Sequence, residues 1–251
     1  MKTLKILAAG ALALFVSSSV FAQADSTTQQ ALDEIAVKSA DVTSYTADVM
    51  TESNVMGFPR ITKGTVSFKA PDKMHVKTTT NAAGGLAQEI FCSGGIVHTY
   101  LPAMKTATRM DMSALEAAGH DPLAAAQARD ISKPFESFPA ETIGYLGTDQ
   151  TKDGAVHLFD AMPAREDTIV QGLSTPQMSV DTMLFRINAE TGLPAEITML
   201  AADGSVIMEQ TWSNVRVNVA IADSEFEFNP PKGVRVEDMT DGALSAMNCT
   251  E

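Results

Sequence analysis

The chain has 251 residues, of which 18 are lysine or arginine and 31 are aspartate or glutamate, giving a formal net charge of −13. Such an acidic chain is a poor binder of nucleic acid, because contacts with phosphates need lysine and arginine. The same charge argues against docking on an anionic membrane surface. We therefore expect no nucleic acid as a partner.

The first residues have the pattern of a secretory signal peptide. A basic start is followed by the apolar run Ile6–Val16 and by a small-residue exit that ends at Ala22. The apolar run is short for a bilayer span, which favours export over the alternative of a membrane-anchored N-terminus. We expect residues 1–22 to be the signal peptide, with cleavage after Ala22 or Ala24. No cysteine stands at the exit to carry a lipid anchor, so we expect a soluble, exported protein.

An amphipathic helix is expected first, over residues 26–43, where apolar residues such as Ala31 and Ile35 recur at helical spacing. The apolar pattern then changes to a period of two, which indicates strands. Strands are expected within residues 44–53, within residues 64–78 with a break at Pro71, and within residues 88–102 around a Gly94-Gly95 hairpin turn.

The middle of the chain has a different composition. Residues 113–129 are rich in alanine and leucine and predict two short helices, divided near Gly119 and Pro122. Strand patterns return from Gly144, with turns expected at Asp153-Gly154, Asn188–Pro194 and Asp203-Gly204. Residues 163–177 are polar and are the best candidate for a mobile loop.

The plan is therefore a helix, about five strands, further helices and about six strands, which is a mainly β chain with helices. Consecutive hairpins make an antiparallel sheet, and a sheet of about 11 strands must curl or close. The helices can bury their apolar sides only against its concave face. With a single tryptophan and three tyrosines to fill it, the interior leaves room for a hydrophobic ligand.

No pattern of catalytic residues stands out. The four histidines lie far apart, and none has metal-site spacing. His98 and His157 lie within strand patterns, where a packing or surface role is commoner than metal binding. We expect no cofactor and no metal site, and no enzymatic activity; an exported enzyme with a scattered site is the less favoured alternative.

Sulfur-containing residues leave several interpretations open. The 14 methionines could fill the core, line a plastic cavity for acyl chains, or bind Cu(I) through their thioethers. Met110 and Met112 are the only close pair. The two cysteines, Cys92 and Cys249, could form a disulfide in an exported protein, or stay a buried and a loose thiol.

Several segments together resemble the LolA/LolB-type periplasmic lipoprotein carriers. They are TSYTADVMTES (43–53), GTVSFKAPDKMHVKT (64–78), CSGGIVHTYLPAMKTATRM (92–110), LFRINAETGLPAEITMLAADGS (184–205) and NVAIADSEFEFNPPKGVRVED (218–238). The last contains the F-x-F-x-P-P-x-G-V pattern of the family. We interpret Phe226 and Phe228 as inward residues of a short strand, Pro230-Pro231 as its end, and VRVED as a last short strand.

The resemblance implies that residues 25–251 form a single domain, an incomplete antiparallel β-barrel with a helical lid over a hydrophobic cavity. It implies a monomeric periplasmic shuttle that carries lipoprotein acyl chains or another hydrophobic ligand toward the outer membrane. An inner-membrane releasing complex and an outer-membrane acceptor would be its partners. On this basis we expect the cavity to be lined by Tyr45, Ala47, Val49, Val66, Phe68, Met74, Val76, Met110 and Leu123.

One position departs from the family. Its members carry an arginine just before the strand-breaking proline, which latches the lid helices, and Ala70 stands there in this chain. Whether a latch forms is therefore left open. Related folds also occur in envelope-stress regulators, so a sensor or regulatory domain on the same scaffold is the alternative function.

Overall fold

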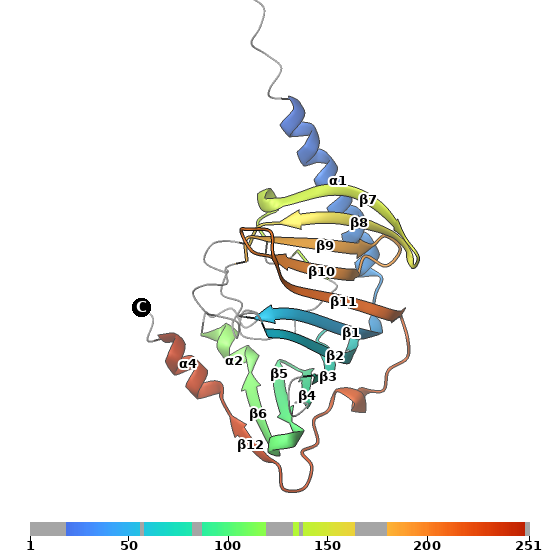
Figure 1. The fold of residues 1–251 in the computed structure, drawn as a ribbon. Helices are drawn as coiled ribbons and strands as arrows, with labels where there is room; N and C mark the ends of the chain where they lie inside the picture. Colours follow the sequence, from blue (N-terminus) through green and yellow to red (C-terminus); the bar gives the residue numbers. More distant parts are fainter. Residues whose placement is uncertain are drawn as a thin grey trace, which may run out of the picture.

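A twelve-stranded sheet dominates the computed structural model, which describes residues 19–55, 58–81, 87–118, 133–135, 138–163 and 180–248 (Figure 1). Its strands in the first half of the chain are β1 (Ser44–Val55), β2 (Phe58–Lys69), β3 (Lys73–Thr80), β4 (Ala87–Ser93), β5 (Ile96–Leu101) and β6 (Thr106–Asp111). Those of the second half are β7 (Ile143–Thr151), β8 (Gly154–Ala161), β9 (Thr182–Asn188), β10 (Pro194–Leu200), β11 (Val206–Val217) and β12 (Arg235–Asp238). The predicted class, a mainly β half-barrel with helices, is confirmed.

Helices are few among the described residues. They are α1 (Ser19–Ala40), α2 (Met112–Ala117) and α4 (Thr240–Asn248), with the 3-10 turns η1 (Pro102–Met104), η2 (Ala140–Thr142) and η3 (Asp223–Phe226). The first helix begins and ends earlier than the expected 26–43. Of the two helices expected within 113–129, α2 occupies the start, and the rest of that range lies outside the described residues, as do residues 164–177 of the expected loop.

The strands lie in the order β12-β6-β5-β4-β3-β2-β1-β11-β10-β9-β8-β7, and the sheet is open at both ends. Antiparallel pairing of β1 with β11 joins the two halves of the chain at the middle. The sequence predicts that all strands pair antiparallel through consecutive hairpins. This expectation is wrong at one edge of the sheet, where β12 pairs parallel with β6. A parallel pair needs a crossover, and the chain supplies one by passing from β11 across the sheet to its far end (Figure 1).

The turns between strands follow the expected residues. Gly94 and Gly95 adopt φ values of 60° and 73°, which suit a tight β4–β5 hairpin and which glycine tolerates best. Pro71 follows the end of β2, where proline cannot continue the ladder. The links β7–β8, β9–β10 and β10–β11 also fall at the turns predicted for them.

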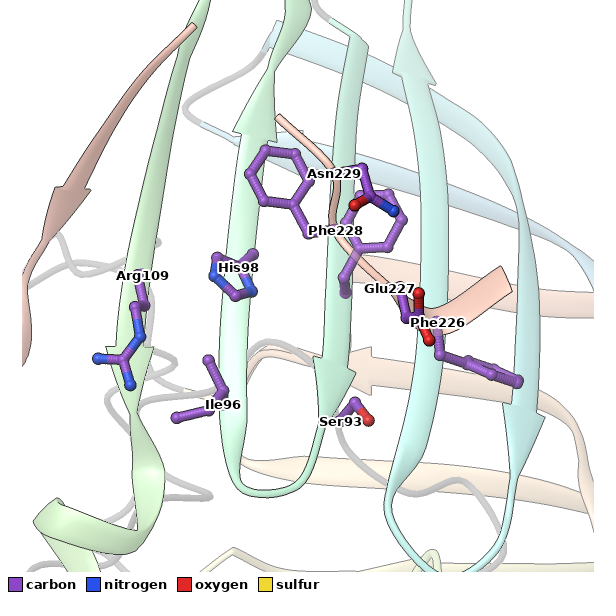
Figure 2. A pocket seen from close by; sticks show the side chains of 9 residues that line it. Ser93, Ile96, His98, Arg109, Phe226, Glu227, Phe228 and Asn229 are labelled. Atoms are coloured by element: carbon purple, nitrogen blue, oxygen red, sulfur yellow. The ribbon is translucent and has the colours of Figure 1, made fainter. Parts of the chain in front are cut away.

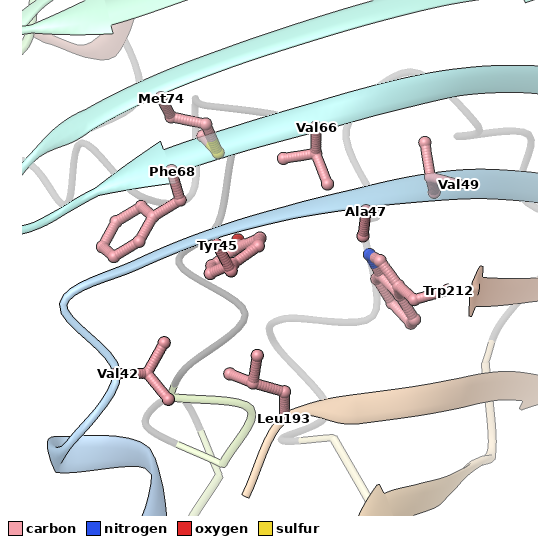
Figure 3. Close-up of a cluster of buried hydrophobic side chains, with 9 residues drawn as sticks. All are labelled: Val42, Tyr45, Ala47, Val49, Val66, Phe68, Met74, Leu193 and Trp212. Carbon is pink, nitrogen blue, oxygen red and sulfur yellow. The ribbon is translucent and has the colours of Figure 1, made fainter. Parts of the chain in front are cut away.

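We call the face of the sheet that carries Tyr45, Phe68 and Phe185 the inner face, and the opposite one the outer face. On the inner face, one cluster joins β1, β2 and β3 to Leu193 and Trp212 (Figure 3). A second cluster packs Ala31 and Ile35 of α1 against β7, β8 and β9. As predicted, α1 buries its apolar side against the sheet, at the β7 end; α2 and α4 pack together near β6.

The outer face of β2–β6 is crossed by residues 219–234, which we call the strap. Asp223 of η3 lies 2.7 Å from Lys69 Nζ, and Glu225 Oε1 lies 3.0 Å from His75 Nδ1. Phe226 is buried at 2% exposure, and Phe228 lies over aromatic rings of β4 and β5. The predicted short strand at Phe226 is therefore wrong, because this residue ends the 3-10 turn η3, in which it is the buried residue. The final short strand at VRVED is confirmed as β12.

Truncating the strap's anchor should destabilise the protein. We expect Phe226→Ala to lower the free energy of unfolding by about 3–5 kcal/mol, because it removes a fully buried aromatic side chain and leaves a cavity. Urea unfolding followed by circular dichroism measures this difference. The neighbouring Glu227→Ala is the control, since Glu227 is exposed. Equal stability of the two variants would contradict the anchoring role.

Asp238 should make the β12 edge sensitive to acid. Hydrogen bonds from Thr240 and from the Arg109 guanidinium, 2.6 Å away, lower the pKa of Asp238 from 3.8 to about 2. A lowered folded-state pKa stabilises the protein above pH about 4, and this contribution is lost as the pH falls toward 2. Asp238→Asn should therefore reduce the Tm at pH 7 and flatten its decline between pH 4 and 2.

The matched control for this acid effect is Glu237→Gln. It removes the same charge from the same strand, but its pair with Arg235 is a surface contact of 3.6 Å. If both variants show the same Tm profile across this pH range, Asp238 has no special role.

Candidate functional site

An unbroken row of apolar side chains crosses the inner face over seven strands. In register order from β11 to β6, the row consists of Val217, Tyr45, Phe68, Met74, Cys92, Val97 and Met110. Partners in antiparallel register point to the same face, so the row is continuous. With about 4.8 Å between neighbouring strands, it spans about 29 Å. We call it the long row.

Burial changes along the long row. Tyr45, Phe68 and Met74 at its middle are buried at 0–6% exposure, whereas Cys92, Val97 and Met110 toward β6 are only half-buried. The middle of the row is thus packed as core. Its β4–β6 end offers apolar surface that the described residues cover incompletely.

The residues expected to line a cavity lie largely together. Tyr45, Ala47, Val49, Val66, Phe68 and Met74 all belong to one buried cluster, and Val76 packs against it (Figure 3). Met110 lies on the same face at the end of the long row, four strands from Phe68. Leu123 lies outside the described residues. The described residues of this set thus share the inner face, and their role as ligand contacts stays a prediction.

The same cluster contains residues that the sequence reasoning missed. Trp212 pairs with Val49, and Leu193 comes from the β9–β10 link. Gly192 in this link approaches α1 so closely that a Cβ there would lie 2.7 Å from the Ile35 carbonyl oxygen. This contact holds the link under the helix and directs Leu193 into the core. The alternation around Trp212 was visible in the sequence, but its pairing with β1 was not.

Charged groups gather on the outer face rather than beside the long row. Glu209 pairs with Glu52 across β11 and β1, and its pKa is raised by burial and by the nearby carboxylates of Glu196 and Glu52. On the inner face, burial and the charge of Asp72 raise the pKa of Cys92 to about 11, so that its thiol stays neutral. The inner face is therefore apolar and uncharged along the row.

Cys92 is a free thiol, and its expected partner Cys249 lies outside the described residues. The predicted disulfide therefore stays a prediction. A neutral thiol within an apolar row behaves as a small hydrophobic group. In this position Cys92 contributes to the surface of the row and has no sign of activation as a nucleophile.

Three methionines that are distant in sequence form a second inner-face row. Met183, Met199 and Met208 occupy facing register positions on β9, β10 and β11. All three are half-buried, and only Met183 packs against one of the two core clusters. We call this the methionine row. The sequence indicated that methionine was abundant, but it could not indicate that these three meet.

A shallow pocket of about 410 Å³ lies on the outer face, between the strap and β4–β6 (Figure 2). Phe91, His98 and Phe228 contribute aromatic rings to it, and Arg109 lies at its side. The guanidinium of Arg109 already contacts Asp238 at 2.6 Å and Asp111 at 3.4 Å. Its charge is thus compensated within the protein, and the pocket is separated from the long row by the sheet.

His98 and His157 pack against aromatic side chains. His157 is buried, and its Nδ1 lies 3.1 Å from the Tyr145 hydroxyl oxygen. His98 is half-buried on the outer face, where burial and the charge of Arg109 lower its pKa. A packing or surface role was expected for both: His157 is buried within the sheet, and the His98 ring centroid lies 5.1 Å from that of Phe228. In the described part of the chain, no group of three or more histidine, cysteine, aspartate or glutamate residues could hold a metal ion, and no helix has the length and apolarity to cross a membrane.

Comparison with curated sequences finds one remote relative. An uncharacterized protein of Methanocaldococcus jannaschii is 26% identical over 238 residues, which are 93% of this chain and 61% of the relative. The chain therefore spans less than two thirds of that protein. No protein-family model matches the chain.

Solved structures resemble this chain at low sequence identity. An uncharacterized conserved protein from Thermus thermophilus has a TM-score of 0.51 at 12% identity, covering 84% of this chain and 99% of that one. Lipoprotein LppX of Mycobacterium tuberculosis has a TM-score of 0.47 at 13% identity, covering 79% and 100%. A candidate outer membrane lipoprotein-sorting domain from Vibrio parahaemolyticus has a TM-score of 0.40 at 10% identity, covering 81% and 97%. The similarity to the Thermus thermophilus structure shows a shared fold.

Proposed function

We propose that this protein is a carrier that binds the acyl chains of lipids or lipoproteins on its inner face. The observation that carries the proposal is the long row, a continuous apolar surface of about 29 Å across seven strands. Burial of a CH₂ group on such a surface stabilises a complex by about 0.8 kcal/mol. An acyl chain that follows the row would therefore bind through many small apolar contacts.

The half-buried end of the long row is the place where binding would begin. Cys92, Val97 and Met110 offer apolar surface there without any charged neighbour in the row. The buried middle, around Tyr45 and Phe68, would open only if the elements over it moved. Release of a buried chain would accordingly need these covering elements to be displaced.

We further propose that residues 1–22 direct export and that residues 25–251 act as one soluble, monomeric domain in the periplasm. In this location the protein would move a lipid or lipoprotein toward the outer membrane. It would receive its load from an inner-membrane releasing complex and pass it to an outer-membrane acceptor. The proposal assigns the chain no catalytic activity. Ala70, which is exposed in the turn after β2, would leave the family's arginine latch without a counterpart at this position.

Mass spectrometry of the native protein tests the carrier function directly. We expect purified protein to contain lipid or lipoprotein acyl chains, or to take them up from detergent-solubilised lipid, because the inner face exposes apolar surface to a ligand. Purification in a lipid-free state together with failure to load would contradict the proposal. Capture of an envelope regulator by such an empty chain would favour the sensor function instead.

A matched pair of variants on β5 tests which face binds. Val97 lies on the inner face in the long row, whereas its neighbour Ile96 points to the outer face and lines the shallow pocket. Val97→Glu should reduce lipid loading at least about tenfold, because a carboxylate beside an acyl chain costs more than about 1.4 kcal/mol to desolvate. Ile96→Glu introduces the same charge and should leave loading unchanged.

The Tm of both variants shows whether each remains folded. Half-buried positions were chosen because a glutamate at Val49 or Phe68, which are buried at 8% and 5% exposure, would also destabilise the core. If Val97→Glu loads as well as the unaltered chain, or if Ile96→Glu alone loses loading, the inner face is not the binding surface.

A further inference from the structure

We propose that the methionine row is a binding site for a monovalent copper ion. Met183, Met199 and Met208 come from three neighbouring strands, β9, β10 and β11, and face one another in register on the inner face. Thioether sulfur is a soft ligand that selects Cu(I) over harder divalent ions. The site lies along the ends of these strands, away from the long row, and the inference does not depend on the carrier function.

The backbone spacing allows all three sulfurs to reach one ion. Met199 occupies the central strand, and facing Cα atoms in antiparallel pairs lie about 4.5–5.5 Å apart. Met183 and Met208 on the flanking strands are thus separated by about 10 Å. Each methionine has three rotatable bonds, so the two outer side chains can turn their sulfurs toward the centre.

The register partners at the two ends of the row are small residues. Ala161 pairs with Met183 on one side, and Ser53 pairs with Met208 on the other. Neither side chain is large enough to crowd the outer methionines from the side. The half-buried state of the three methionines leaves a path for an ion from solvent.

Ordinary core filling explains these methionines less well. Met74 is the methionine that belongs to a buried cluster, at 6% exposure. Met199 and Met208 belong to neither of the two core clusters, and Met183 only packs against the edge of one. The row also contrasts with Met110 and Met112, which are close in sequence: Met110 lies in the long row, whereas Met112 begins α2.

Competition of the purified chain with bicinchoninate for Cu(I) under a reductant tests the site. We expect one copper ion per chain, bound through sulfur as seen by X-ray absorption spectroscopy. Met199→Leu should weaken Cu(I) binding at least about tenfold, as loss of a ligand interaction does at metal sites. Leucine conserves volume and apolarity, so the fold and any lipid loading should be retained. Ag(I) can replace Cu(I) as the probe, because it is a similarly soft monovalent ion and does not change oxidation state.

Two control variants separate this site from other sulfur atoms. Met104→Leu alters a methionine that is exposed at 61% on η1, and Cys92→Ser removes the thiol of the long row. Both should bind Cu(I) like the unaltered chain. The proposal is overturned if the chain does not compete for Cu(I), if Met199→Leu binds normally, or if Cys92→Ser abolishes binding. Since Met199→Leu leaves the apolar face intact, loss of copper with normal lipid loading distinguishes this site from the carrier function.

Discussion

The pairing of β1 with β11 is the constraint on which the rest of the structure depends. It joins a strand near the start of the chain to one near its end, and it places Tyr45 beside Val217 and Val49 beside Trp212. Without it, the strands β1–β6 and β7–β11 would be two separate meanders, each with an exposed edge. With it, their apolar faces form one surface, on which both core clusters and both rows lie. Pairing β1 with β11 closes a long loop of chain, which costs conformational entropy. The burial of the joined apolar faces must offset this cost.

The two faces of the sheet contact different parts of the protein, because successive residues of a strand point to opposite faces. On β3, Met74 and Val76 enter the inner-face core, whereas His75 between them contacts Glu225 of the strap on the outer face. The strap is therefore more than a connection to β12. It covers the outer face of β3–β5 with Phe226 and Phe228, and it leaves the inner face of the same strands for packing and for a ligand.

The burial of apolar side chains varies across the inner face, from fully buried core to half-buried surface. Around Tyr45 and around Phe159 the side chains are fully buried, and α1 covers the second of these regions. Toward β6, and along the ends of β9–β11, the apolar side chains are only half-buried. Apolar surface that remains accessible in a folded chain is a common mark of a binding site. The two ends differ in chemistry: the first combines the hydrocarbon of Val97, the thiol of Cys92 and the thioether of Met110, and the second consists of three thioethers.

Much of the fold could be predicted because its signals are local. Alternation marks which residues of β1, β2 and β3 share a face, and glycines and prolines mark the turns, as at Gly94-Gly95 and Pro71. Six of the cavity residues expected from the sequence lie in one buried cluster for this reason. Prediction failed where one local pattern is compatible with two structures. Alternation at Phe226 suggested a strand, but the short η3 turn buries the same ring.

The sequence by itself determined the hairpins, the apolar faces of the individual strands and the acidic character of the chain, since each depends on residues close together in the chain. Only the tertiary structure decided which strands are neighbours. The β1–β11 pair, the parallel β12–β6 pair and the meeting of Met183, Met199 and Met208 all depend on register between segments that are far apart in sequence. Register is chosen by the burial of whole faces at once, and no single segment contains that information.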